Sequence, residues 1–418
     1  MGARGRRESR RAAVGGVLLA LSVVLSGCGG DETLVPPRPT GASTAGRAES
    51  AQRTLSDLVQ ALGRADTAAA DALATPQARP AIEAMVANVK LLGLDELGLR
   101  FVDDQSVLSA SDRDQYGPQA WAGTAELAYR LAGWDAQATR LETRFVFVRS
   151  GGRDLIAGVG GGEDRTPLWV AGPVRTEHVG RALVIAAARQ DAAHYLALAR
   201  QALVDVGQVL PRWNGRLVLE VPGSEDELDA ALAAPKEQYA NIAAVTTTVD
   251  GSLAAGSPVH VFLNPRVFDG LGPRGAQVVV SHETTHVATD ATFASMPTWL
   301  LEGFADYVAL DHAGIPVDTA ASQILARIRK DGPPDHLPTS NELDPTANGL
   351  GATYEEAWLA ARFVASQYGE DKLVAFYRAV DDGARVEVAF RTVLGTTEDA
   401  FVRSWRADLR RLADGVAG

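Results

Sequence analysis

The stretch Ser281-His282-Glu283-Thr284-Thr285-His286-Val287 decides how the rest of the chain is interpreted. Positions four apart lie on one face of an α-helix, so His282 and His286 can both direct an imidazole at one metal ion. Glu283 follows the first histidine and can reach a water bound to that metal. Two neutral imidazoles and a carboxylate base are the groups that zinc-dependent hydrolysis of an amide requires. The alternative interpretation is a surface helix that happens to carry two histidines.

A second motif, P-T-W-L-L-E-G-F-A-D-Y at 297–307, supplies a third metal ligand. Glu302 lies 16 residues after His286, which leaves room for a turn and a returning helix. A catalytic zinc takes three protein ligands and keeps one position open, so we predict one Zn²⁺ per chain on His282, His286 and Glu302. Asp306 follows one helical turn later and suits a carboxylate that holds a ligand histidine in one tautomer. A solvated acidic pair on an amphipathic helix is the alternative.

The two motifs together resemble the gluzincin metallopeptidases, the thermolysin-like superfamily, and especially its peptidase MA-like members. These carry H-E-x-x-H followed by W-L-x-E-G-x-A-x-Y, and the matching residues here are His282, Glu283, His286, Trp299, Leu300, Glu302, Gly303, Ala305 and Tyr307. The resemblance implies that His282, His286 and Glu302 bind zinc and that Glu283 is the general base. It is specific over about residues 260–310 and looser from there to the C-terminus.

Departures from the family pattern narrow the interpretation. The interval from His286 to Glu302 is shorter than in thermolysin or the large aminopeptidases. The chain has no G-x-M-x-N stretch of the kind that holds a free amino terminus, so an endopeptidase is favoured over an exopeptidase. Thr289 and Thr292 stand where metzincins have Gly and a third His. Asp290, one turn past His286, is the rival third ligand, as in the aspzincin pattern.

The resemblance also suggests where substrate contacts lie. A Tyr or His from the C-terminal half of related peptidases donates a hydrogen bond to the oxyanion, and Tyr354 is the candidate here, with Tyr307 second. A buried packing tyrosine is the alternative. The strand before the zinc helix is the substrate-binding sheet edge in gluzincins, which points to 259–264, with Val259, Val261 and Leu263 as edge residues. His260 in this strand is predicted to be a surface histidine.

Composition limits the classes of partner. Apolar residues make up 46% and charged residues 22% of the chain, as in soluble globular proteins. The formal net charge is −12, and without the first 27 residues, which carry five Arg and one Glu, it is about −16. An acidic chain of this kind predicts no nucleic-acid partner and is compatible with a peptide or protein substrate.

The N-terminus predicts export and lipid anchoring. Five arginines precede an apolar run from Ala12 to Leu25 that is too short to span a membrane comfortably. Leu25-Ser26-Gly27-Cys28 resembles a bacterial lipobox and contains the only cysteine. The resemblance implies a lipoprotein signal peptide over 1–27, a lipid on Cys28, and a protein anchored to the cytoplasmic membrane and facing outward. A plain secretory signal is the alternative.

The rest of the chain divides into three predicted segments. Residues 28–50 are rich in Gly, Pro, Thr and Ser and predict a disordered tether. Residues 51–175 predict a helix packed on an antiparallel sheet, which resembles NTF2-like or cystatin-like domains. This segment has a hairpin over 142–157 and a strand at 168–170. Residues 178–418 predict a zincin-like domain with a small sheet, an active-site helix opened by Pro273 and a mostly helical C-terminal half.

The sequence therefore predicts an α+β protein that is a zinc-dependent peptidase at the outer face of the cytoplasmic membrane. In the proposed reaction Glu283 takes a proton from the metal-bound water and returns it to the leaving amine. The alternative function is a catalytically inactive peptidase-like lipoprotein that serves as a binding or structural module, because a fold does not guarantee an activity.

Overall fold

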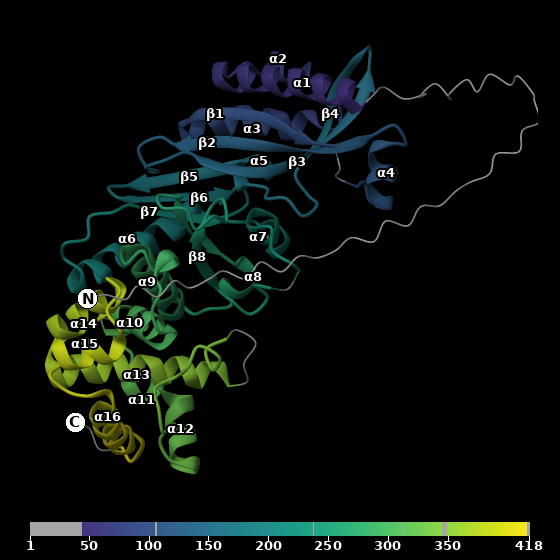
Figure 1. Ribbon diagram of the computed structural model, residues 1–418. Helices are drawn as coiled ribbons and strands as arrows, with labels where there is room; N and C mark the ends of the chain where they lie inside the picture. The colour runs from purple at the N-terminus through teal and green to yellow at the C-terminus, as the bar shows by residue number, and fades with distance from the viewer. Residues whose placement is uncertain (1–43, 105–106, 237, 312, 345–348, 416–418) are drawn as a thin grey trace, which may run out of the picture. The chain divides into compact units, whose positions relative to one another are not determined.

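Two β-sheets, both formed before residue 264, and the helices around them build the described part of the chain (Figure 1). The computed structural model describes residues 44–104, 107–236, 238–311, 313–344 and 349–415. The predicted α+β class is confirmed. The predicted signal peptide and Cys28 lie outside the described residues.

The first sheet is antiparallel, as predicted, and its strands follow chain order: β1 (Leu94–Asp103), β2 (Trp121–Leu131), β3 (Thr139–Ser150) and β4 (Arg153–Val159). The accompanying helices are α1 (Thr44–Arg64), α2 (Thr67–Asp71), α3 (Arg79–Leu92) and α4 (Ala110–Tyr116). Helix α1 includes residues 44–50, so the tether prediction is wrong for them. The helix begins N-terminal to the predicted boundary because this stretch contains four good helix formers, Ala45, Arg47, Ala48 and Glu49.

Side chains of β3 alternate between the sheet face that packs against the helices and the opposite face. Leu141, Phe145 and Phe147 are buried in the core that α1 and α3 share, whereas Glu142 lies exposed on the other face. The predicted hairpin is confirmed: β3 and β4 pair antiparallel around Gly151 and Gly152. Both glycines have positive φ, 58° and 83°, which a tight two-residue turn requires.

The strand predicted at 168–170 is wrong, because these residues form the short helix α5 (Leu168–Ala171). Pro167 begins it with a φ of −54°. Leu168, Trp169 and Val170 are all buried. A short apolar run buried on every side fits a strand or a helix equally well, so periodicity could not separate them.

The second sheet has five strands in the spatial order β5-β6-β7-β9-β8. They are β5 (Val174–Val179), β6 (Ala182–Ala187), β7 (Leu217–Val221), β8 (Ala244–Thr248) and β9 (Val259–Leu263). Strands β6, β7 and β9 are parallel, and β5 and β8 pair antiparallel at the two edges. The sheet therefore has β8 as the edge next to β9.

The predicted substrate edge at Val259, Val261 and Leu263 is wrong, because β9 is paired on both sides. The chain turns back after β8 and inserts β9 between β8 and β7. Apolar β9 is suited to a central position, whereas β8 carries the three threonines of 246–248 and is suited to an edge. Proximity in the sequence to the helix that carries H-E-x-x-H did not reveal this spatial order.

Each face of the second sheet is covered. Helices α6 (Ala192–Val209) and α9 (Pro273–Ala288) pack on one face. On the other face Leu183, Ile185 and Phe262 join the core of the first sheet, with α5 and α7 (Glu225–Leu232) between. Side chains from both sheets thus form one core, and the predicted boundary at 175–178 stays a prediction.

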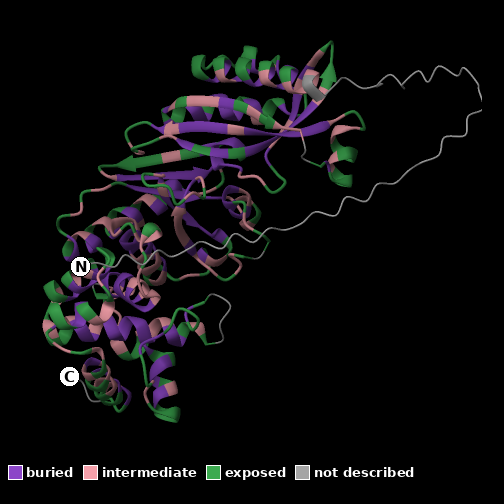
Figure 2. Cartoon of the chain, viewed as in Figure 1, coloured by how far each residue is buried: buried purple, intermediate pink, exposed green. Residues whose placement is uncertain are grey.

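The C-terminal half is helical, as predicted, and Figure 2 shows its buried residues gathered where the helices face one another. Its elements are α8 (Pro265–Phe268), α9, the 3₁₀ helix η1 (Ala291–Phe293), α10 (Thr298–Asp311), α11 (Val317–Ala320), α12 (Ser322–Asp331), α13 (Leu350–Tyr368), α14 (Glu370–Asp381), α15 (Val386–Thr392) and α16 (Glu398–Ala413). Among the helices that the structure describes, none is both long and apolar enough to cross a membrane.

Helices α10 and α13 approach each other closely at Gly303. A Cβ placed on Gly303 would lie 2.3 Å from the backbone oxygen of Ala357 in α13. Only glycine permits this approach, because a backbone atom cannot rotate away as a side chain can. The glycine next to Glu302 therefore fixes the position of α13, and with it that of Tyr354.

A buried histidine links the two sheets. His260 in β9 is 1% exposed; its Nδ1 lies 2.7 Å from Glu220 Oε1 and its Nε2 lies 3.1 Å from Asp135 Oδ1. Burial opposes charging of the imidazole, but the two carboxylates outweigh it and raise the pKa of His260 to about 10. The prediction of a surface histidine is wrong, because β9 is central and its partners come from distant segments.

Gly303→Ala should lower the free energy of unfolding by about 1–3 kcal/mol, because the methyl group forces α13 away from α10. Gly207→Ala in α6 is the matched control, since a Cβ there meets nothing within 4 Å and should be neutral or slightly stabilising. Urea unfolding followed by circular dichroism measures both. Equal stability of the two variants would contradict the tight approach.

His260 should make stability depend on pH. Below the unfolded-state pKa of 6.5 the imidazole is charged in both states and its contribution is complete; as pH rises toward the folded pKa of about 10, that contribution is lost. His260→Leu should cost about 3–5 kcal/mol near neutral pH and flatten this slope, because two buried carboxylates lose their cation. Urea titrations at pH 6, 8 and 10 test this, with exposed His194→Leu as the control. An unchanged slope would contradict the assignment.

Candidate metal centre

Helix α9 presents the H-E-x-x-H motif from a buried position. It begins at Pro273, the residue predicted to open it, and it packs Val280 against α6 and the second sheet. Ser281 Oγ donates to Asp205 Oδ2 of α6 at 2.7 Å. This bond fixes the rotation of α9 about its axis one residue before His282, so the histidines face away from α6.

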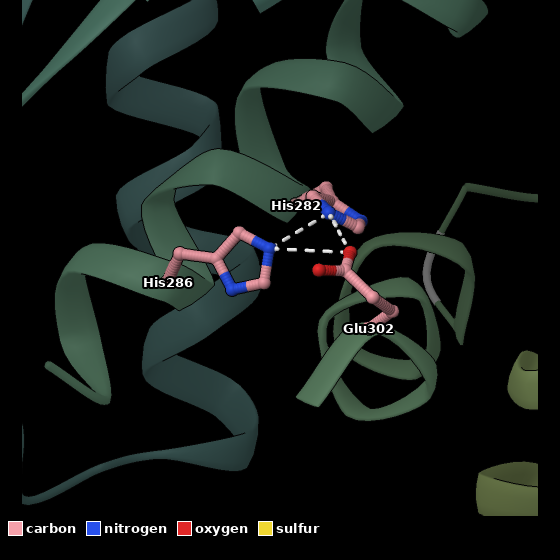
Figure 3. A group of neighbouring side chains, drawn as sticks. All are labelled: His282, His286 and Glu302. Carbon is pink, nitrogen blue, oxygen red and sulfur yellow. Dashed lines mark hydrogen bonds and ion pairs between the residues drawn. The ribbon is translucent and has the colours of Figure 1, made fainter. Parts of the chain in front are cut away.

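The two histidines converge. His282 Nε2 and His286 Nε2 lie 2.9 Å apart, and the ring planes are nearly perpendicular, at 87°. Figure 3 shows both imidazoles turned toward the same point, with Glu302 opposite them. The 289–297 connection returns the chain so that α10 packs on α9. Glu302 Oε2 then lies 3.2 Å from His282 Nε2 and 3.5 Å from His286 Nε2.

These three atoms fit a tetrahedral metal site. Zinc bonds to nitrogen and oxygen of about 2.0–2.2 Å place neighbouring donor atoms about 3.3–3.6 Å apart in a tetrahedron. Of the three observed separations, 3.5 Å lies in that range, and 3.2 and 2.9 Å lie just below it. Within the described residues, His282, His286 and Glu302 are the group of His, Cys, Asp and Glu side chains placed to hold a metal ion. The sequence prediction selected the same three residues.

Asp306 lies where the sequence placed it, one turn after Glu302. Its Oδ1 is 2.7 Å from His282 Nδ1, which leaves Nε2 for a metal. Burial opposes charging of His282, but Asp306 and Glu302 outweigh it and raise its pKa well above the usual value. Burial likewise opposes ionisation of Glu302, whereas His286 and His282 hold its pKa well below the usual range. The carboxylate is thus ready to act as a ligand.

Glu283 lies beside this group without joining it. The side chain is buried, and its Oε2 accepts a 2.6 Å hydrogen bond from Thr246 Oγ1 of β8. Sequence reasoning missed Thr246. The contact spans 37 residues, and a threonine in a strand gives no signal that its hydroxyl will face a helix.

The alternative third ligand, Asp290, and the second candidate for the oxyanion donor, Tyr307, lie outside this pocket. Asp290 has a left-handed backbone, φ 50°, and lines a separate cavity of about 220 Å³ near Tyr377. Tyr307 donates a hydrogen bond from its hydroxyl to Glu370 Oε2 at 2.9 Å, so this hydroxyl is already used outside the candidate site.

Tyr354 lines the same pocket as the three candidate ligands. Burial and the charges of Glu302, Asp306 and Glu283 raise the pKa of its phenol, so it keeps its proton.

The pocket over the three residues has a volume of about 470 Å³. Its polar groups are the motif side chains together with Asn241, Thr246, Thr292 and Tyr354. The remaining wall is largely apolar and comes from five segments: Ile242, Ala243, Ala244, Val245, Val278, Val279, Ala291, Leu301 and Leu350. An apolar wall that surrounds a few convergent polar groups is typical of a small-molecule or peptide site.

Comparison with models of known protein families and with curated proteins found no match for this chain. The resemblance to gluzincins thus rests on the residues of the two motifs. The structure adds that three of these residues, His282, His286 and Glu302, lie close enough together to hold one metal ion.

Asp306→Asn should weaken zinc binding about 10–100-fold, because the amide no longer fixes the tautomer of His282 as a carboxylate does. Competition with a chromophoric chelator measures the dissociation constant. Asp318→Asn, an exposed aspartate in α11, is the control and should bind zinc like the wild type. Equal affinity of the Asp306 variant would exclude the role given to this carboxylate.

Proposed function

We propose that the protein is a zinc-dependent peptidase. The observation that carries the proposal is the meeting of His282, His286 and Glu302 around one point, with the carboxylate of Glu283 in the same pocket. Non-enzymatic metal capture gives no use for a base next to the ligands. The chemistry expected of this set of donors is hydrolysis of an amide.

His282, His286 and Glu302 would hold one Zn²⁺, which when bound acidifies a water and polarises a carbonyl. Glu283 accepts the proton of the attacking water and passes it to the leaving amine. Thr246 occupies Oε2 of Glu283, which leaves Oε1 for that proton. Tyr354 is the proposed donor to the oxyanion, a contact worth about 2.7–4 kcal/mol when it is made by a single preorganised donor.

The edge strand β8 is the proposed binding site for the substrate backbone. Two backbone hydrogen bonds set its pairing with β9: Asn264 N–H to Ala243 O, 2.8 Å, and Val249 N–H to Pro258 O, 2.9 Å. Antiparallel pairing alternates, so the backbone groups of Ala244 and Thr246 point away from β9, toward the open edge. Both residues line the pocket. An extended peptide added there would lie against the metal centre.

Two further features remain proposals. We favour endopeptidase over exopeptidase activity, because the sequence lacks the motif that holds a free amino terminus. We also propose that a lipid on Cys28 anchors the protein to the outer face of the cytoplasmic membrane, on the strength of the lipobox. The peptide substrate would then be an extracytoplasmic protein.

Glu283→Gln should retain stoichiometric zinc and lose at least about 100-fold in kcat, because the amide cannot accept the proton of water. The assay is cleavage of an unfolded protein by the chain without residues 1–28, with metal content measured in parallel. A chelator should abolish wild-type cleavage, and added zinc should restore it.

Glu227→Gln in α7 is the control for this substitution, since that carboxylate accepts bonds from Gly223 N–H and Arg189 and does not line the pocket. A wild-type chain that binds zinc but cleaves no peptide would favour the inactive scaffold. A Glu283 variant as active as the wild type would show that another group is the base.

A further inference from the structure

Thr246 makes two contacts with one residue of the zinc helix. Its Oγ1 lies 2.6 Å from Glu283 Oε2 and 3.1 Å from the backbone oxygen of Glu283. A hydroxyl has a single proton, and the shorter distance to the charged oxygen indicates that the carboxylate receives it. The 3.1 Å contact then carries no hydrogen bond, and it shows only that Oγ1 lies next to the same turn of α9.

The position of Thr246 in β8 gives it a second role. Its side chain faces α9, on the same face as Ala244, which is buried in the core with α9. Its backbone N–H and C=O point to the open edge, because the pairing with β9 uses residues 243, 245, 247 and 249. Among the described residues, no strand pairs with this side of β8.

We propose that Thr246 is a positioning residue that aligns the Glu283 carboxylate with a peptide bound at the β8 edge. The inference rests on the proposed peptidase function. Thr246 would contact both groups that must be aligned: its backbone pairs with the substrate, and its hydroxyl holds the carboxylate of the base. The distance between base and scissile bond is then set by the internal geometry of a single threonine.

This arrangement removes a freedom that the glutamate would otherwise have. A glutamate side chain rotates about three bonds, and its carboxylate can occupy several positions next to a metal site. The Thr246 bond selects one position and occupies Oε2. Displacement of a catalytic group by about 1 Å can cost about 100-fold in rate. Loss of the hydroxyl should thus act on turnover, while zinc binding by His282, His286 and Glu302 continues.

The test compares three variants of β8 in the chain without residues 1–28. Thr246→Val removes the hydroxyl and keeps the branched shape that suits a strand. Thr246→Ser restores the hydroxyl without the methyl group. Thr247→Val, the matched control, makes the same change one residue on, on the opposite sheet face and outside the pocket lining. Zinc content, thermal midpoint, kcat and KM are measured for each with one unfolded protein substrate.

Thr246→Val should lose about 10–100-fold in kcat with KM changed less than threefold and zinc content unchanged, because the base is misaligned while the edge and ligands remain. Thr246→Ser should recover most of kcat, and Thr247→Val should match the wild type. A Thr246→Val variant with wild-type kcat, or a serine variant as impaired as the valine variant, would overturn the inference and leave the peptidase proposal intact. An inactive, zinc-loaded wild-type chain would overturn both.

Discussion

Four polar side chains between α9 and α10, one buried and three partly buried, impose the constraint on which the site depends. His282, His286, Glu302 and Asp306 meet at a helix interface whose surroundings are apolar. Burying ionisable groups costs several kcal/mol each unless they are paired or bind a metal. Here they satisfy one another in a ring of contacts that leaves three donor atoms turned inward. A cation at that point would be within reach of all three donor atoms.

The rest of the fold holds this interface in place. The Ser281–Asp205 bond sets the rotation of α9 against α6. Gly303 lets α13 approach the backbone of α10, which brings Tyr354 to the pocket. The residues beside the motif histidine and the motif glutamate are thus the residues that pack the helices. Chemistry and packing are specified together in the same short stretches of sequence.

Local spacing explains how much could be predicted. The i, i+4 histidines, the turn-length gap to Glu302 and the one-turn offset of Asp306 depend on helical geometry alone, and the structure brings all four together. The residues that were missed depend on how distant segments pair. Strand β9 is central because β8 pairs outside it, and buried His260 finds its partners Glu220 and Asp135 in β7 and in the connection after β2. No short-range pattern encodes such contacts.

The first sheet has a physical role in the site although it contributes no residue to the pocket lining. It covers the face of the second sheet opposite α9, where Leu183, Ile185 and Phe262 would otherwise meet water. It also supplies Asp135 to the cation of His260, next to the β8 pairing partner Phe262. Removing the first sheet would expose an apolar surface and break a buried ion pair one strand away from Thr246. Separating the first sheet from the second would carry that cost, so the packing favours a permanent support for the edge at which substrate is proposed to bind.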